Sequence, residues 1–421
     1  MCRMTATRLP AGPRSPASVP AVKRSTDGPS ASSRPKVPRG FGVVWVTVAL
    51  DMVGFGIVLP VLPLYAEDFG ASPALAAALL AVFSAAQVVA APLWGRLSDR
   101  FGRRPVLVMA LVGSSAGSLV TGLAGALWVL YLGRALDGFS GSSYAVGQAA
   151  VSDLAEPEER PRLLGLLAAA FGVGFVAGPL IGSFAALGGR ELPFLVAAAL
   201  AAANACLALV RIPGGRSSSS SKVGVRFGWG AAGPVVRRLA LLSMVSMVGF
   251  AGFEATFAML IERRFPEVGD PTVYGLFASI GLLMVAVQTL IVGPVNAGLG
   301  SRRALRIALL LVAAGMVVLS IGGGWVGLAA ALILLVVGQG VFGPTLSNAT
   351  VEHVDSSARG AALGLQQGAG ALGRIAGPLI AGGLFDQLGL SAPYLVAAAL
   401  AVLALAVLPS GTEPSTPGKP L

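Results

Sequence analysis

The sequence has little cysteine, histidine or charge, and each shortage excludes a class of protein. Cys2 and Cys206 are the only cysteines, so we expect neither a disulfide framework nor a thiolate metal site. His353 is the only histidine, which argues against a histidine-based metal centre. Charged residues make up 12% of the 421 positions and apolar residues 55%, whereas a soluble protein has about 25% charged residues. The composition therefore predicts a polytopic membrane protein.

Twelve apolar stretches follow one another from Phe41 onward, and each is long enough to cross a lipid bilayer as a helix. They cover residues 41–64, 73–94, 105–123, 125–151, 162–187, 191–210, 238–261, 272–297, 304–322, 324–351, 360–385 and 391–409. The predicted fold is all-α, with twelve transmembrane helices.

Basic residues indicate which side of the membrane each loop occupies. Because the number of spans is even, both ends of the chain lie on one side, and 25 of the 30 Lys and Arg residues fall in the tails and loops of that side. Three lie on the opposite side, and two, Arg134 and Arg374, lie inside spans. The positive-inside rule therefore predicts a multi-pass protein of the inner (plasma) membrane with both termini in the cytoplasm. Since the bases flank apolar spans, the net charge of +11 does not indicate a nucleic-acid partner.

Polar segments divide the chain into two halves. Residues 1–40 are rich in Pro, Ser and Arg and contain no apolar run, which predicts a disordered cytoplasmic tail and excludes a cleavable signal peptide. Residues 211–237 include five consecutive serines and are predicted to be a cytoplasmic linker between six-helix bundles at 41–210 and 238–409. Residues 410–421 are predicted to form a second cytoplasmic tail.

The two halves repeat each other. The segment 177–181, AGPLI, recurs at 376–380, and the segment 52–55, MVGF, recurs at 247–250. Each half has an even number of spans, so the two bundles are pseudo-symmetric about an axis along the membrane normal. A cavity between such bundles is exposed to each side in turn when the bundles rock. The architecture predicts a carrier rather than a pore. We also expect that the protein is not an enzyme, that it is a monomer in the lipid bilayer, and that it takes a small-molecule substrate and needs no cofactor.

Ionisable side chains inside the spans need a reason, because an ionised group at the bilayer centre costs about 2.5–3.5 kcal/mol. Asp51 lies about ten residues into the first span, roughly 15 Å deep. Arg134 and Asp137 share one helix face in the fourth span, and Glu254 lies on a stripe of Met and Phe in the seventh. Two interpretations stay open for these four: proton coupling or substrate binding, or a structural charge neutralised by its neighbours. Arg374, alone in the eleventh span, needs an acidic partner that the sequence does not identify.

Glycines at every fourth position predict close helix packing. Gly174, Gly178 and Gly182 form such a stripe in the fifth span beside Pro179, and the eleventh span contains Gly377 and Pro378. A flat stripe lets a neighbouring helix approach, and proline is tolerated where neighbours satisfy the freed carbonyl group. From the residues alone, both stretches are packing seams.

The most distinctive motif is the charged stretch 95–105, GRLSDRFGRRP, between the second and third spans. Its four arginines, one acid and two glycines suit a tight, water-facing turn held by ion pairs. The motif resembles the loop between helices 2 and 3 of the major facilitator superfamily of secondary transporters. The matching residues are Gly95, Leu97, Asp99, Arg100, Gly102, Arg103 and Arg104. The resemblance implies a cytoplasmic charge network in which Asp99 lies near Arg359 and Arg103 pairs with Asp153. The stretch 298–303, GLGSRR, has glycine where the acid would be, which argues against a second such network.

Further stretches resemble one branch of that superfamily, the twelve-helix drug–proton antiporters that include the tetracycline exporters. Residues 51–63 are similar to their first helix, and Arg134 and Gly138 fit the helix 4 motif, whose arginine is associated with proton transfer. Gly174, Gly178, Pro179 and Gly182 fit the helix 5 motif of antiporters, with Ser183 in place of its final glycine. The resemblance implies an exporter that exchanges a drug or other amphipathic compound for protons, driven by a proton gradient. Two alternatives stay open: a proton-coupled uptake symporter for a sugar, organic acid or other metabolite, and a non-transporting membrane sensor or scaffold.

Overall fold

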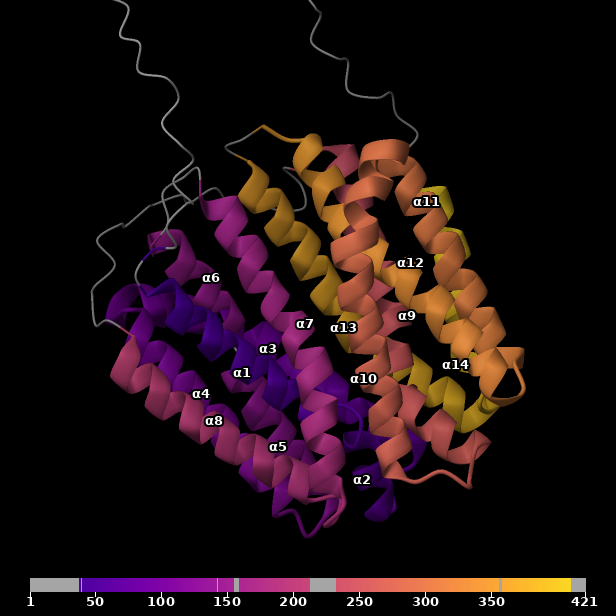
Figure 1. Cartoon of the computed structure of the whole chain (residues 1–421), viewed down its shortest axis with the longest axis horizontal. Coiled ribbons are helices and arrows are strands. Elements are labelled where there is room, and N and C mark those ends of the chain that lie inside the picture. Colours follow the sequence, from indigo (N-terminus) through magenta and orange to yellow (C-terminus); the bar gives the residue numbers. More distant parts are fainter. Residues whose placement is uncertain are drawn as a thin grey trace, which may run out of the picture. The chain divides into compact units, whose positions relative to one another are not determined.

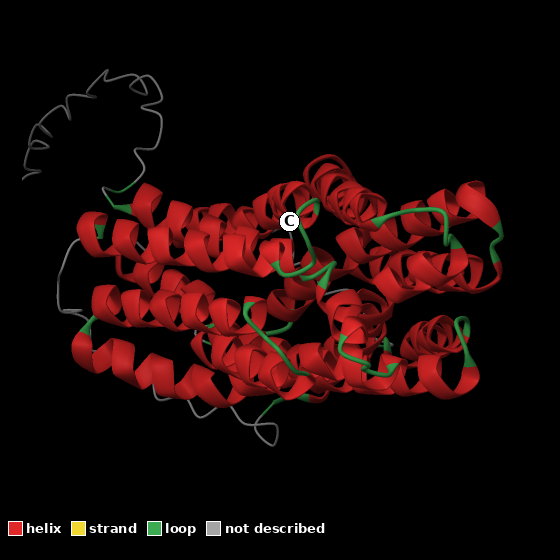
Figure 2. Cartoon of the chain, turned by 90° about the horizontal axis from the view of Figure 1, so that it is seen from below, coloured by secondary structure: helices red, strands yellow, loops and turns green. Residues whose placement is uncertain are grey.

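The computed structural model describes residue 38 and residues 40–141, 143–154, 159–212, 232–355 and 358–409. The predicted tail at 410–421 lies outside these residues, as do the predicted tail at 1–40 except for residues 38 and 40 and most of the predicted linker at 211–237. Every regular element in the described part of the chain is a helix (Figure 2).

The first half builds six membrane spans from eight helices (Figure 1). These are α1 (Phe41–Val58), α2 (Leu62–Asp68), α3 (Pro73–Phe101), α4 (Arg103–Gly122), α5 (Leu127–Ser140), α6 (Ser143–Leu154), α7 (Arg160–Ala186) and α8 (Leu192–Arg211). The start of α3 shows how local sequence sets a boundary. The Ser72 side chain accepts a hydrogen bond from the Leu75 backbone N–H, and Pro73 occupies the first helical position, where its missing N–H is not needed.

The second half repeats this arrangement. Its elements are α9 (Pro234–Arg264), α10 (Asp270–Ala286), the π-helical turn η1 (Val287–Ile291), α11 (Val292–Ile321), α12 (Gly324–Glu352), α13 (Arg359–Leu388) and α14 (Ala392–Val407). Among the described residues, nine stretches are long and apolar enough to cross a membrane. One of them, Asp270–Ile321, contains two spans, and the broken span α5–α6 and the shorter α14 complete the twelve.

The structure corrects two predicted boundaries and explains a third. The first span ends at Val58 rather than at residue 64, because the chain turns and continues as the short helix α2. The fourth span, predicted as one helix over 125–151, is broken after Ser140, where Gly138 packs its backbone against Phe83 of α3. The eighth and ninth spans meet at Gly300, whose φ of 71° and ψ of 160° are accessible essentially only to glycine.

The same backbone conformation recurs at the equivalent turn of the first half. Gly102, between α3 and α4, has a φ of 93° and a ψ of 163°. Matching seams also hold each half together. Gly174 and Gly178 of α7 lie against the backbone of α1, and Gly373 and Gly377 of α13 lie against that of α9. The sequence repeat is therefore also a structural repeat of turns and helix contacts.

The two halves meet along two helix pairs, α3 with α13 and α7 with α10. Figure 1 shows α7 and α10 side by side. Gly281 of α10 packs against the backbone at Phe175 of α7, and Gly382 of α13 packs against Ala77 of α3. We call the side where α1 begins and α3 ends the tail face, and the side where α3 and α10 begin the far face. Gly382 and Ala77 lie toward the far face, so the halves are in close contact there.

Candidate functional site

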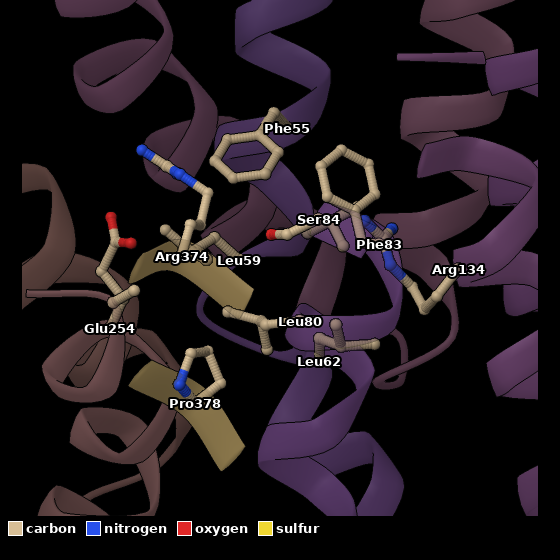
Figure 3. A pocket seen from close by; sticks show the side chains of 12 residues that line it. Phe55, Leu59, Leu62, Leu80, Phe83, Ser84, Arg134, Glu254, Arg374 and Pro378 are labelled. Carbon is tan, nitrogen blue, oxygen red and sulfur yellow. The ribbon is translucent and has the colours of Figure 1, made fainter. Parts of the chain in front are cut away.

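A cavity lies between the two halves, about midway along the spans. It contains about 410 Å³ of space not filled by atoms, part of which is open to solvent. Its lining residues are Phe55, Val58, Leu59 and Leu62 near the end of the first span, Leu80, Phe83 and Ser84 of α3, Arg134 of α5, Ala251 and Glu254 of α9, and Arg374 and Pro378 of α13. Most of this lining is apolar or aromatic, and three of the residues are charged. Figure 3 shows Glu254 and Arg374 on one side of the cavity and Arg134 on the other.

Arg134 contacts two side chains of the first half, and a third side chain holds one of these two. Its Nη1 donates to Asp137 Oδ2 at 2.9 Å, and the Ser114 hydroxyl donates to the other oxygen of Asp137. The guanidinium carbon of Arg134 lies 4.6 Å from the centre of the Phe83 ring, a cation–π contact. Arg134 is 2% exposed and its Nε, which is buried, has no hydrogen-bond partner. The predicted pairing of Arg134 with Asp137 is present, and one donor of the arginine stays available.

Glu254 and Arg374 lie together in the second half without forming an ion pair. Glu254 is 4% exposed, and its Oε1 is buried without a hydrogen-bond partner. Arg374 is close enough to interact electrostatically with Glu254, but its only hydrogen-bond contact among the described residues is with the Met247 sulfur, at 3.7 Å. Glu254 therefore faces the cavity rather than the outer surface. Arg374 has an acidic neighbour that the sequence did not identify, although the two charges remain unbridged.

Asp51 lies outside the cavity lining. It is half-buried on α1, and Ser143, at the start of α6, donates a hydrogen bond to its Oδ2. The break between α5 and α6 brings this hydroxyl to Asp51. Asp51, a candidate for proton coupling, is thus tied to a neighbouring helix of its own half. Of the predicted site residues, Arg134, Glu254, Arg374 and Pro378 line one cavity, and Asp137 joins them through Arg134.

The charged loop between α3 and α4 forms a small network on the tail face. Arg103 Nη1 donates to Asp99 Oδ1 and to the Ser98 hydroxyl, each at 2.9 Å, and Arg103 Nε donates to Asp153 Oδ2 at 2.9 Å. The contact expected between Arg103 and Asp153 is therefore present. Arg104 donates to the Leu209 carbonyl oxygen of α8, which ties the loop to the end of the sixth span.

The remaining members of the predicted network do not come together. Among the described residues there is no contact between Asp99, whose side chain is 71% exposed, and Arg359, which is exposed at the start of α13. Arg100 lies over the ring of its neighbour Phe101, and a side chain at Gly95 would meet open space. The described residues thus show no ion pair between Asp99 and Arg359. All the ion pairs between the two halves in the described residues lie on the far face instead.

At the equivalent place in the second half, a hydrogen bond from a serine replaces the Arg103–Asp153 ion pair. Ser301 follows Gly300 as Arg103 follows Gly102, and its hydroxyl donates to Glu352 Oε2 at 3.1 Å, at the end of the tenth span. Asn348 donates to the same carboxylate at 2.7 Å. The absence of a charged network here was predicted, whereas the hydrogen-bonded substitute was not.

Sequence reasoning missed a cluster of charges on the far face. Arg190, in the loop before α8, contacts Asp68, Glu262 and Asp270 at 2.8 to 3.0 Å, and Arg263 contacts Glu67 at 2.8 Å. The acids that contact Arg190 are 72 to 122 positions away along the chain, so no local motif connects them. One signal existed: Arg190 and Arg263 are two of only three bases on the sparsely basic side.

Two repeated helical bundles, with a cavity between them that contains three charged side chains, define the architecture of a secondary transporter. Residues 44–266 and 239–420 each match the sequence model of the Major Facilitator Superfamily, and the chain belongs to this superfamily. The tetracycline resistance protein of class C from Escherichia coli is 31% identical over 88% of this chain and 96% of that protein. Multidrug resistance protein 1 of Bacillus subtilis is 26% identical over 82% of this chain and 89% of that protein.

Solved structures share the fold. The human organic anion transporter MFSD10 (TETRAN) has a TM-score of 0.68 and 24% identity, and the match covers 88% of this chain and 99% of that one. A bacterial homologue of the human lysosomal transporter Spinster, in an inward-facing and occupied conformation, also has a TM-score of 0.68, with 15% identity over 87% of this chain and 91% of that one. The protein is a multi-pass membrane transporter, and family membership supports a transporter rather than an enzyme.

Proposed function

We propose that the protein is a proton-coupled antiporter that exports a drug or other amphipathic compound by alternating access. The observation that carries the proposal is the cavity between the halves, where a mostly apolar lining with two phenylalanines also contains Glu254, whose buried Oε1 has no hydrogen-bond partner, and the unbridged base Arg374. Such a lining suits a compound with a flat apolar body and a polar or charged group. The similarity to tetracycline and multidrug resistance proteins supports drugs of these kinds as candidate cargo.

The proposed topology places the tail face in the cytoplasm and the far face outside the plasma membrane. The distribution of basic residues supports it, because 25 lie in the tails and loops of one side and 3 on the other. The proposed domains are six-helix bundles at 41–210 and 238–409 that rock about the cavity, joined by a cytoplasmic linker at 211–237. In this topology the far-face ion pairs close the outer side, so the structure is closed to the outside.

Glu254 is the best placed acid for coupling. Among the described residues it is the only carboxylate that lines the cavity, so the same side chain can bind a proton in one state and interact with cargo in another. Arg374 is close enough to interact with whichever form is present. Asp137 and Asp51 are already hydrogen-bonded to Arg134 and Ser143, and we assign them supporting roles in holding the walls of the cavity.

The loop around Arg103 is proposed to act as a cytoplasmic switch. In the present state the Asp99 side chain is 71% exposed and, among the described residues, forms its ion pair with Arg103. Closing the tail face would bring the ends of α3 and α13 together, and Asp99 and Arg359 carry opposite charges at those ends. We therefore expect them to pair only in the state that is closed to the cytoplasm.

Transport by purified protein in liposomes tests the proposal. With a pH gradient imposed, we expect the protein to move tetracycline or a cationic dye against the proton flow, and Glu254→Gln to abolish the coupled flux. Glu267→Gln is the matched control, because Glu267 is exposed in the loop after α9. Flux that is unaffected by collapsing the pH gradient, or by Glu254→Gln, contradicts proton antiport through Glu254. Proton uptake on adding a sugar would favour a symporter instead.

A further inference from the structure

Six charged residues from both halves gather on the far face. The first half contributes Glu67, Asp68 and Arg190, and the second contributes Glu262, Arg263 and Asp270. None of them lines the central cavity. They belong to the loops and helix ends that meet where the halves are in contact.

Arg190 is the centre of this cluster. Its Nη1 donates to Asp68 Oδ1 at 2.9 Å, its Nη2 to Glu262 Oε1 at 2.8 Å, and its Nε to Asp270 Oδ2 at 3.0 Å. Glu262 and Asp270 belong to the other half, so one guanidinium joins the halves through two separate carboxylates. Only arginine offers donors in such a planar fork, and the compact ammonium of lysine cannot reproduce it.

A second ion pair crosses the same boundary. Arg263 Nη2 donates to Glu67 Oε1 at 2.8 Å, and the guanidinium carbon of Arg263 also lies 5.0 Å from the centre of the Phe385 ring. Beneath these charges, Tyr274 of α10 packs against Gly182 of α7 and is 1% exposed. The ion pairs thus cover a packed contact between the two halves.

The cluster joins the halves through ion pairs that are partly exposed. Of the two carboxylates in the second half, the Glu262 side chain is 37% exposed, so solvent screens its attraction to Arg190, whereas Asp270 is 22% exposed and accepts two hydrogen bonds. Burial raises the pKa of Glu67 and of Asp68, and the nearby arginines offset that rise only in part. The cost of desolvating these carboxylates therefore cancels part of the free energy that the ion pairs contribute to the closed state. Ion pairs that water can reach suit a contact that must open in every transport cycle.

We propose that Arg190 is the positioning residue that holds the far face closed, and that release of its two carboxylates in the second half opens the cavity to the outside. The proposal rests on the alternating access and topology proposed above, and needs neither a particular cargo nor proton coupling. Losing Arg190 shifts the population toward the outward-open state without touching the cavity wall.

Labelling from outside the cell tests this. Ser84 lines the cavity, so Ser84→Cys, in a background with Cys2 and Cys206 replaced by serine, places a single reporter thiol there. A membrane-impermeant maleimide added to intact cells without cargo reacts with this thiol only when the far face opens. We expect Arg190→Gln to raise the labelling rate about tenfold, as loss of two partly exposed cross-half pairs implies.

Arg264→Gln is the matched control. Arg264 is also a far-face arginine, but it donates to the carbonyl oxygens of Leu319 and Gly322 within its own half. We expect this variant to leave the labelling rate unchanged. An Arg190→Gln protein that labels no faster than the Arg264→Gln control overturns the proposal.

A charge exchange gives a second test that does not depend on Arg190→Gln folding. Glu67→Arg and Arg263→Glu, made singly, each place like charges on opposite sides of the boundary, and both should speed labelling. The double variant restores an ion pair and should return the rate to within about twofold of the parent. Failure of either single variant to speed labelling, or of the double variant to restore the rate, overturns the clamp. The labelling experiment contains no cargo. Its result can therefore be interpreted even if the transport assay shows that the proposed antiport is wrong.

Discussion

Two alanine substitutions four residues apart on α7 should have different consequences, because the two glycines face different neighbours. A Cβ at Gly178 would lie 2.6 Å from the Gly56 Cα, within the first half. A Cβ at Gly182 would lie 2.5 Å from Tyr274 Cε1, across the boundary between the halves. We predict that Gly178→Ala lowers the stability of the first bundle. Gly182→Ala should instead raise the population of the state in which the far face is open.

The size of each effect follows from these contacts. Ordinary contacts of a Cβ begin near 3.4 Å, so α7 and α1 must separate by about 0.8 Å to admit a methyl group at Gly178. Both sides of that contact are backbone and cannot rotate away, which places the cost at the usual ~1–3 kcal/mol of overpacking. The apparent melting temperature of the purified protein should fall by roughly 1–3 °C.

At Gly182 the new methyl group acts as a wedge under the far-face clamp. Tyr274 belongs to the second half and is almost fully buried, so the strain is relieved when the halves move apart on that side. A strain of about 1 kcal/mol corresponds to a fivefold change in the open population. The Ser84→Cys reporter should therefore be labelled from outside about fivefold faster, with a smaller change in melting temperature than for Gly178→Ala.

Gly165→Ala is the control for both substitutions. Gly165 is on the same helix, and a Cβ there meets nothing within 4 Å. Alanine favours the helix by up to ~1 kcal/mol over glycine, so this variant should be as stable as the parent or slightly more so. The reasoning fails if the Gly178→Ala protein has the same melting temperature as the Gly165→Ala protein. It also fails if the reporter in Gly182→Ala is labelled no faster than in Gly165→Ala.

Three further predictions concern charge. Asp137→Asn leaves Arg134 buried without its counter-charge and should destabilise the protein by ~3–5 kcal/mol, and Arg134→Met in the same chain should recover part of this in thermal unfolding. Ser301→Arg should form an ion pair with Glu352 like that of the first half and raise stability by ~0.2–1 kcal/mol at low salt, an increase that added salt removes. Burial raises the pKa of Asp68, so the closed face binds its proton more tightly than an open, hydrated one. Acid also lowers the thiolate fraction of the reporter, so each labelling rate is divided by that of a free thiol at the same pH. This normalised rate should slow, not quicken, as the outer pH falls through the range just above the ordinary Asp pKa of about 3.9.

Much of the fold follows from the sequence because the relevant signals are local. A helix needs about twenty apolar residues to cross the bilayer, so composition alone predicts the spans. The glycine turn at Gly102 needs a backbone conformation that other residues avoid, and the same requirement applies to Gly300 in the repeat. Arg103 and Asp153 lie at the ends of neighbouring spans, so a family resemblance was enough to pair them.

The site was only partly accessible in this way, since it depends on how each helix is rotated. Successive residues of a helix point about 100° apart. When a span is apolar on nearly all sides, its sequence does not reveal which side faces the cavity. Glu254 faces the cavity and Asp51 does not, although both are single acids within apolar helices. The break after Ser140, which brings Ser143 to Asp51, was likewise not visible in a continuous apolar run.

The sequence by itself determined a twelve-span membrane protein with repeated halves, because hydrophobic length and glycine turns act within a few residues of one another. Only the tertiary structure decided that Glu254 and Arg374 share a cavity and that Arg190 joins the two halves. Those groups come from distant parts of the chain, and packing of whole helices brings them together. A charge cluster held by such packing leaves no local pattern, so it becomes visible only when the halves are placed side by side.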